Sequence, residues 1–597
     1  MDAGPLLAVL GIGAALAWWW NHIEQTMEKP PRGRWWLWAA WGIPLLDWLR
    51  WQGVEIPVTW FEPLGFTAIT ALGVAALAKG ETRRLPISEN GWRTLVAAAG
   101  MIVAAYWFWQ ACDAYDRYLL GFYDWGHFVR RIVNTWEGRG FLLETPSLPA
   151  YWDHYNPGLA LLAPLWGVCP DVRLFFALHA ICLAAPGFLI YAAARRWGAS
   201  PGESAAWAAA YWCFPSTGQL NLSDTYGWHL VTFALPAIWG AILAASAKRW
   251  MWAAALAALA CSFKETVWVA LGCFCFALAV QTWRDRKREP EQREWLSSRC
   301  SWKAWLAAWA VFCVGFTLVF SWAGFAEYQT SRFQHLGDST FQILLSPCLR
   351  PQVFWREIAT TADIYFVLAL TIPLGWPLLR RGAGLLLAAA LPLGVLLAWK
   401  HPPAVSVAYQ YQTTLLPILF AAALAGAAVL RKRGERSPGV LALAGCLTAS
   451  FFYGALPWSS PTLTIAIKTT YPGETPFAPS REAERGPGSP AHAALEKIIQ
   501  QVGGPDSRVL ASGRIAAHLL GVRRLEAIEQ GVVRWPAIEK EAGEGKQAIE
   551  VFDWVVVDTL ERFQQSADKI PFVIEEAQQA NYSLVRESHG ILVFKKP

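Results

Sequence analysis

Long apolar runs separated by short polar segments occupy the chain up to about residue 456. A membrane-spanning helix needs about 20 mostly apolar residues. Runs that approach this length are taken as predicted spans: 4–20, 35–51, 59–79, 92–112, 172–194, 203–217, 230–247, 250–263, 266–283, 303–323, 364–379, 382–399, 409–430 and 438–456. The pattern predicts an α-helical polytopic membrane protein with about 14 transmembrane helices. The first run lacks a basic leader, so we interpret it as a retained helix rather than a signal peptide.

One long polar stretch, residues 113–171, interrupts the apolar runs. It contains acids, histidines and arginines beside many aromatic residues. Within it, the segment 158–168 (GLALLAPLWGV) is apolar but too short to cross a membrane. We therefore expect this segment to form an interfacial helix that lies along the outer membrane surface.

The composition changes after residue 456, which predicts a separate soluble domain. Residues 457–493 are rich in Pro, Ser, Gly and Thr, as is typical of a linker. In residues 494–597, SRVLAS and FDWVVVDTL are predicted strands, helices are expected over 514–520 and 562–580, and YSLVRES and GILVFKK predict a closing hairpin. The expected organisation is additional transmembrane helices over 1–91, a transmembrane core over 92–456 with the outer loop 113–171, the linker, and a small α/β domain.

Composition and charge agree with a membrane protein. The chain has 597 residues, of which 55% are apolar and 16% charged, whereas about 25% charge is typical of soluble domains. Lys and Arg cluster in short loops such as 284–288 and 431–436, which we assign to the cytoplasmic side. The outer loop and the C-terminal α/β domain then lie outside the cytoplasm. The net charge of +6 is small for this length, so we expect no nucleic-acid partner.

Four clusters of ionisable residues fall on the predicted outer side. Most of them join acids with histidines: Tyr123-Asp124-Trp125-Gly126-His127, Asp153-His154-Tyr155-Asn156-Pro157, the run from Asp224 to His229, and Lys264-Glu265. Ionisable residues near a membrane are energetically costly, so they tend to be paired or functional. Each cluster also has a simpler explanation. Aspartates such as Asp124 and Asp224 often cap helices or face solvent, His127 and His154 can be structural, and Lys264-Glu265 can be an interfacial ion pair.

Three strings in this region resemble a bacterial family of membrane proteins, domain of unknown function 2079. They are FYDWGHFVRRIVNTWEGRGF, DHYNPGLALLAPLW and RLFFALHAICLAAPGFLIYAAARR. The family pattern of an aromatic residue, Asp, any residue and Gly matches Tyr123, Asp124 and Gly126. A later Gly-Arg-Gly run includes Arg139. His154 before Pro157, His229 and the pair Lys264-Glu265 match further features of the family.

That family is similar to the GT-C glycosyltransferases, which use lipid-phosphate-linked sugars as donors. The resemblance implies a GT-C-like fold and a catalytic role for Asp124 as base or metal ligand. It further implies substrate binding by His127, Arg139, His154, Asp224, His229, Lys264 and Glu265. Whether Asp124 binds a divalent cation, Mg²⁺ or Mn²⁺, together with His154 or Glu265 is left open.

The resulting hypothesis is a bacterial inner-membrane enzyme. It transfers a sugar from a polyprenyl-phosphate donor to a glycan, lipid or protein acceptor on the extracytoplasmic face. Two alternatives remain at this point. The first is a transporter or flippase of a lipid-linked or polar solute, although no internal repeat is evident. The second is a non-catalytic membrane scaffold whose α/β domain binds a partner.

Overall fold

The computed structural model describes residues 86–146, 148, 150–223, 226–287, 299–321, 325–433, 438–459, 485–561 and 567–597, together with 49, 64–68 and 70. The first three predicted spans lie wholly or mostly outside these described residues. The chain divides into two compact units, which are described separately. Unit 1 comprises Met1–Tyr106, Ala180–Leu220 and Val231–Thr470, and unit 2 comprises Trp107–His179, Asn221–Leu230 and Tyr471–Pro597.

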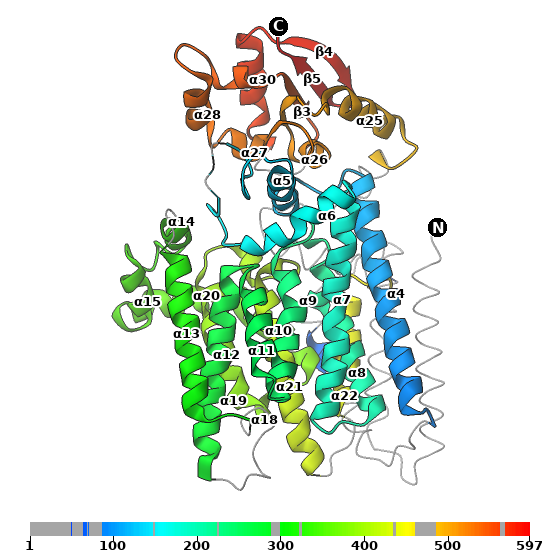
Figure 1. The fold of residues 1–597 in the computed structure, drawn as a ribbon, viewed down its shortest axis with the longest axis vertical. Helices are drawn as coiled ribbons and strands as arrows, with labels where there is room; N and C mark the ends of the chain where they lie inside the picture. The colour runs from blue at the N-terminus through cyan, green and yellow to red at the C-terminus, as the bar shows by residue number, and fades with distance from the viewer. Residues whose placement is uncertain are drawn as a thin grey trace. The chain divides into compact units, whose positions relative to one another are not determined.

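Unit 1 is built from helices, most of them apolar. Two long helices, α4 (Glu89–Asp116) and α7 (Arg173–Arg196), each contribute one part to unit 1 and one part to unit 2. The other principal helices are α8 (Pro201–Trp212), α9 (Pro215–Gln219), α10 (Val231–Ser246), α11 (Trp250–Cys261), α12 (Glu265–Arg284), α13 (Trp302–Phe320), α14 (Phe325–Ser331), α15 (Thr340–Leu349), α16 (Pro351–Ile358), α17 (Thr361–Thr371), α18 (Trp376–Arg381), α19 (Ala383–Leu386), α20 (Ala390–Ala398), α21 (Leu415–Lys432) and α22 (Pro438–Tyr453). Helices α10, α11, α12 and α13 stand side by side in Figure 1.

Five helices among the described residues are long and apolar enough to cross a membrane. They are α4, α7, α12, α13 and the segment Gln410–Lys432 that contains α21. A pair bent by 56°, Pro351–Ile358 and Thr361–Leu374, makes six if it is counted as one span. Other predicted spans correspond to shorter apolar helices, such as α10 with 16 residues and α11 with 12. The structure therefore confirms a helical protein with several apolar helices, and the count of about 14 spans stays a prediction.

Glycine lets two helices of unit 1 pack with their backbones in contact. A Cβ atom added to Gly426 of α21 would lie 1.8 Å from the carbonyl oxygen of Leu378 in α18. Reciprocally, a Cβ atom on Gly382 at the end of α18 would lie 1.9 Å from the carbonyl oxygen of Ala422. Small residues at helix contacts are typical of membrane bundles, where close van der Waals packing stabilises helix association.

Unit 2 combines the polar loop of the sequence with the C-terminal domain. The loop folds into α5 (Trp125–Trp136), the 3-10 helix η1 (Pro157–Leu162) and α6 (Ala163–Val168). The last two confirm that 158–168 is helical. Every residue of α5 from Trp125 to Asn134 is buried, including Arg130 and Arg131. A short helix with two buried arginines requires polar partners around it.

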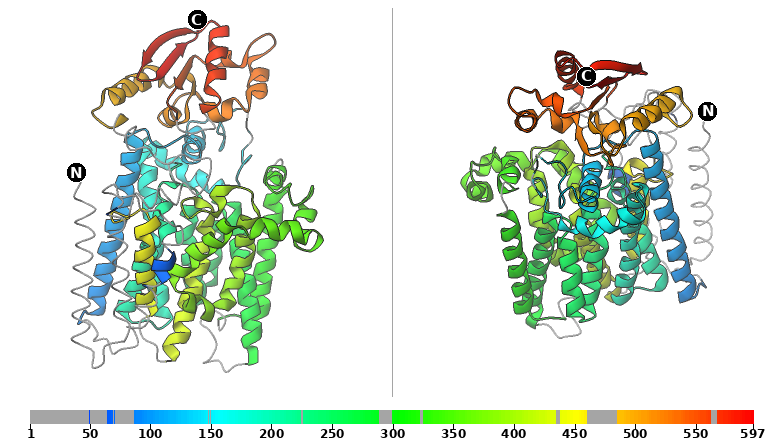
Figure 2. Two further views of the ribbon diagram at one scale, coloured as in Figure 1. Left: turned by 180° about the vertical axis from the view of Figure 1, so that it is seen from behind. Right: turned by 45° about the horizontal axis from the view of Figure 1, so that its top comes forward.

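The C-terminal domain holds a five-stranded mixed sheet in the order β2-β1-β3-β5-β4. Strands β1 (Arg508–Ala511), β2 (Arg524–Ala527) and β3 (Trp554–Asp558) are parallel, whereas β4 (Ser583–Ser588) and β5 (Ile591–Lys595) are added antiparallel. The hairpin of β4 and β5 is drawn in red in Figures 1 and 2. Val555 and Val557 of β3 pack into a core with Phe594 and Val573.

The predicted α/β domain is confirmed in most of its elements. The sequence pattern predicted β1, β3, β4 and β5, together with a helix over α30 (Ile570–Gln579). It did not indicate α25 (Pro490–Val502), whose N-cap is Ser489, because that helix follows directly on the Pro- and Gly-rich segment. Nor did it indicate β2, which contains the buried Glu526 and so lacks the apolar run of a central strand.

Candidate functional site

Asp124 lies at the N-terminal end of α5 in a strained backbone conformation. Its φ is 65° and its ψ is −94°, values that residues other than glycine rarely adopt. The Asp124 side chain does not cap the helix. Backbone hydrogen bonds hold the chain on both sides of it, since Phe122 N–H donates to Gly513 O over 3.0 Å and Phe128 N–H donates to Asp124 O over 3.2 Å. Helix capping therefore does not explain this aspartate, and strain of this kind is common at functional sites.

A buried histidine faces Asp124 from a segment about 100 residues further along the chain. Nε2 of His229 lies 3.4 Å from Oδ2 of Asp124, and the exposed fraction is 2% for the His229 side chain and 17% for that of Asp124. Gly227 lets the segment that carries His229 lie against Trp125 of α5, because it has a φ of +74° and an added Cβ atom would lie 2.4 Å from Cδ1 of Trp125. The first and third sequence clusters thus meet at a partly exposed carboxylate backed by a buried imidazole.

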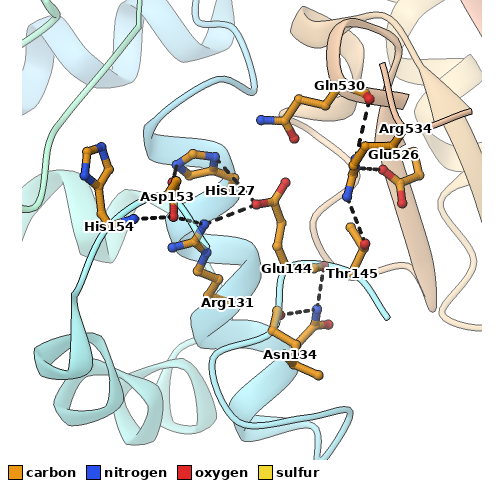
Figure 3. A network of polar contacts seen from close by, with 11 residues as sticks. His127, Arg131, Asn134, Glu144, Thr145, Asp153, His154, Glu526, Gln530 and Arg534 are labelled. Atoms are coloured by element: carbon orange, nitrogen blue, oxygen red, sulfur yellow. Dashed lines mark hydrogen bonds and ion pairs between the residues drawn. The ribbon is translucent and has the colours of Figure 1, made fainter. Parts of the chain in front are cut away.

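A second polar cluster holds the loop segments that follow α5. His127 and Arg131 are four residues apart and so lie on one face of the helix. Figure 3 shows Arg131 between Glu144 and Asp153, with Nη2 3.3 Å from Glu144 Oε2 and 2.7 Å from Asp153 Oδ1. His127 lies 3.7 Å from each of the same two carboxylates. Arg131 thereby ties two loop segments to α5.

Burial and neighbouring charges together set the charge states in this cluster. It lowers the pKa of His127 to about 4, against the opposing effect of Glu144, so the imidazole is neutral at pH 7. Burial alone would raise the pKa of Asp153, but Arg131 and His154 outweigh it and hold that pKa well below its usual range. Arg131 is therefore the charged partner of Asp153 at pH 7. Removing one partner of an ion pair this deeply buried strongly destabilises the protein, because the other charge is left buried and unpaired.

Arg130 and Arg139 attach α5 and the turn after it to the α/β domain. Arg130 donates to the carbonyl oxygens of Leu520, Val522 and Arg523 over 2.6, 2.6 and 2.9 Å. Arg139 donates to the carbonyl oxygen of Val522 over 3.0 Å and to that of Gly521 over 3.2 Å. The resemblance implied substrate binding by Arg139, and sequence reasoning did not find these backbone carbonyls, because the contacts join positions more than 380 residues apart.

The remaining predicted residues occupy several places. The backbone N–H of His154 donates to Asp153 Oδ1 over 2.7 Å, which places His154 beside the second cluster. Lys264 and Glu265 belong to unit 1, where they are buried at the start of α12. Asp224 lies outside the described residues. Sequence reasoning singled out neither Glu144 nor Arg131 as a network member, and only their positions in the folded loop reveal the pairing.

Within the described part of the chain, no three His, Cys, Asp or Glu side chains come together in a way that could hold a metal ion. The pair Asp124 and His229 supplies two such groups. Metal binding through Asp124, His154 or Glu265 stays a prediction.

The family described as "Predicted membrane protein (DUF2079)" matches residues 115–593. The chain belongs to this family. The match confirms the resemblance drawn from the sequence and identifies the chain as a predicted membrane protein. No curated protein and no solved structure matches it.

The DUF2079 match covers all three arrangements described in unit 2. Asp124 and His229, the cluster around Arg131, and the contacts from Arg130 to residues 520–523 all fall between residues 115 and 593. The family region therefore includes the α/β domain as well as the loop that carries Asp124. This agrees with the structure, in which both belong to one compact unit.

Proposed function

We propose that this protein is a membrane glycosyltransferase of GT-C type. It transfers a sugar from a polyprenyl-phosphate donor to an acceptor hydroxyl on the extracytoplasmic face, with Asp124 as general base. The observation that carries the proposal is the setting of Asp124. Its carboxylate is partly exposed, does not cap α5, and has the buried His229 imidazole 3.4 Å away.

The proposed reaction needs one proton acceptor at the acceptor hydroxyl. As the hydroxyl oxygen forms its bond to the anomeric carbon, the bond from that carbon to the phosphate oxygen breaks and polyprenyl phosphate leaves. The hydroxyl proton passes to the Asp124 carboxylate. A positioned carboxylate contributes about 10²–10⁴-fold to such a step. His229 supports the base by fixing the direction of the Asp124 side chain.

The remaining site assignments belong to the same proposal. Positive charge near the leaving phosphate favours its departure. His229 of unit 2 is a candidate for supplying this charge. That Lys264 also supplies it stays a prediction from the sequence. Arg139 is a weaker candidate for phosphate contact through both terminal nitrogens, because each donates to a backbone carbonyl. We place the protein in the bacterial inner membrane with the α/β domain outside the cytoplasm, since basic residues end α7 and α21.

Reconstitution tests the proposal directly. The full chain is placed in proteoliposomes with a radiolabelled polyprenyl-phosphate sugar and a cell-envelope extract that supplies acceptors. We expect the label to leave the donor and appear in a new product, and Asp124→Asn to abolish this transfer. Label that crosses sealed vesicles on an intact donor would instead identify a flippase or transporter. Product formation that is undiminished in Asp124→Asn would refute the role of Asp124.

A further inference from the structure

An arginine-rich pocket lies within unit 2 beside the contacts of α5 with the α/β domain. It is partly open to solvent, and its space together with the solvent at its mouth is about 280 Å³; its polar lining residues include Arg130, Asn134, Arg139, Glu144, Arg523 and Arg524. Neither Asp124 nor His229 lines it. The pocket is thus a feature separate from the candidate catalytic pair, and of the residues assigned to the proposed glycosyl transfer it is lined by Arg139.

The pocket has an excess of positive charge. Four arginines and one glutamate, Glu144, line it, and Glu144 also contacts Arg131 at 3.3 Å. Of the four arginines, Arg524 is paired with Glu541, which lies 2.5 Å from its Nη1, and Glu526 lies 3.7 Å from its Nη2. Like charge and burial act together on Arg130, where burial first and Arg139 second lower the pKa to about 9. Clustered arginines in a partly desolvated site repel one another unless an anion offsets their charge.

Several buried donors of the arginines that line the pocket have no hydrogen-bond acceptor. Within the described part of the chain, these are Nε of Arg130 and Nε and Nη2 of Arg524, and Nη2 also lies 3.7 Å from Glu526 Oε1 in an ion pair. A buried donor without an acceptor is costly, so such donors indicate a missing partner. Arg523, which also lines the pocket, has an exposed side chain that can reach an incoming group from the open side.

We propose that this pocket binds a phosphate group. Guanidinium groups match phosphate oxygens in charge and in their paired donor geometry. The phosphate belongs either to a soluble phosphate compound or to the headgroup of a lipid, because the same oxygens are recognised in both.

A phosphate held here links α5 to the α/β domain. Arg130 and Arg139 come from α5 and the turn after it, whereas Arg524 is the first residue of β2 and Arg523 directly precedes it. The anion would therefore bridge the same two segments that the backbone contacts of Arg130 join. Binding should stabilise this junction, since a ligand that binds only the folded state raises stability by mass action.

Binding to the full chain in neutral detergent tests the site with two probes. Inorganic phosphate is titrated in one arm, and a short-chain isoprenyl phosphate in mixed micelles in the other, each followed by calorimetry. The variants are Arg523→Gln, whose side chain is exposed, and Arg139→Gln. Arg586→Gln on β4, in the same unit but outside the pocket, is the matched control.

We expect saturable binding of at least one probe, weakened at least about tenfold by Arg523→Gln and by Arg139→Gln but not by Arg586→Gln. Binding of the isoprenyl phosphate about tenfold tighter than inorganic phosphate identifies the source as a lipid, and equal affinities identify a soluble phosphate. The proposal is overturned if neither probe binds saturably up to about 10 mM. It is also overturned if Arg523→Gln binds like Arg586→Gln.

Discussion

Replacing Arg130 with methionine should loosen the junction between α5 and the α/β domain. The arginine donates three hydrogen bonds to carbonyl oxygens of residues 520–523, over 2.6 to 2.9 Å. Hydrogen bonds to a charged group contribute about 1.5–3 kcal/mol each, so the three together contribute about 5–9 kcal/mol. Methionine keeps the length and the apolar stem of the side chain but provides none of these donors.

The burial of a charge opposes this gain. Burial and Arg139 lower the pKa of Arg130 from 12.5 to about 9, which corresponds to about 5 kcal/mol against the charged form. The difference between the two effects is about 0–4 kcal/mol, and we expect Arg130→Met to destabilise the junction by about 2 kcal/mol. This is much smaller than the hydrogen bonds alone would indicate.

Hydrogen exchange of the full chain measures this change at the junction. A loss of about 2 kcal/mol should raise amide exchange rates over residues 519–527 about 30-fold. The matched control is Arg586→Met, which removes a partly exposed arginine on β4 of the same domain. The reasoning fails if exchange over 519–527 in Arg130→Met stays within about twofold of Arg586→Met.

Two further changes test separate parts of the site. Because burial lowers the pKa of His127 from 6.5 to about 4, the folded state binds fewer protons than the unfolded state between these values, and stability falls by up to about 3 kcal/mol as the pH drops through that window. His127→Gln should therefore lose less stability than the control His589→Asn between pH 7.5 and pH 5, as measured by thermal unfolding. An equally steep loss of stability in the two variants would contradict the lowered pKa of His127. Gly227→Ala should lower transferase activity at least about tenfold, because the added Cβ atom moves His229 away from Asp124. The control Gly545→Ala should keep its activity, since Gly545 has a φ of +77° but nothing lies within 4 Å of the added Cβ. Equal activities of the two variants would mean that the contact at residue 227 does not matter.

The sequence predicted those elements whose signal is local. FDWVVVDTL is a run of β-branched and apolar residues, and it forms the central strand β3. The closing hairpin is indicated by its turn at His589 and Gly590, both of which adopt positive φ. Strand β2 carries no such signal, because its buried Glu526 is matched by Arg534, a partner that only the fold brings close.

The span count shows a different limit of sequence reasoning. An apolar run reports that a helix is buried, but it does not distinguish burial in lipid from burial in protein. Helix α10 has 16 residues and is mostly buried, and at about 1.5 Å per residue it falls short of a 30 Å hydrocarbon layer. Such helices were predicted as spans on composition alone.

For the candidate site, sequence reasoning identified residues but not their partners. It selected Asp124 and His229, and the structure places their side chains 3.4 Å apart. It assigned Arg139 to substrate binding, whereas the guanidinium of Arg139 donates a hydrogen bond to the backbone carbonyl of Val522. Long-range contacts of this kind leave no local pattern in either segment, since each partner by itself is an ordinary loop residue.

The rate of polyprenyl-phosphate release from the sugar donor tests the central claim most directly. The full chain in proteoliposomes is compared with Asp124→Asn and with Asp506→Asn, which changes an exposed aspartate of the same unit in the same way. A general base contributes about 10²–10⁴-fold, so Asp124→Asn should slow release at least about a hundredfold while Asp506→Asn keeps the normal rate. Equal release rates for the two variants would contradict the assignment of Asp124 as the base.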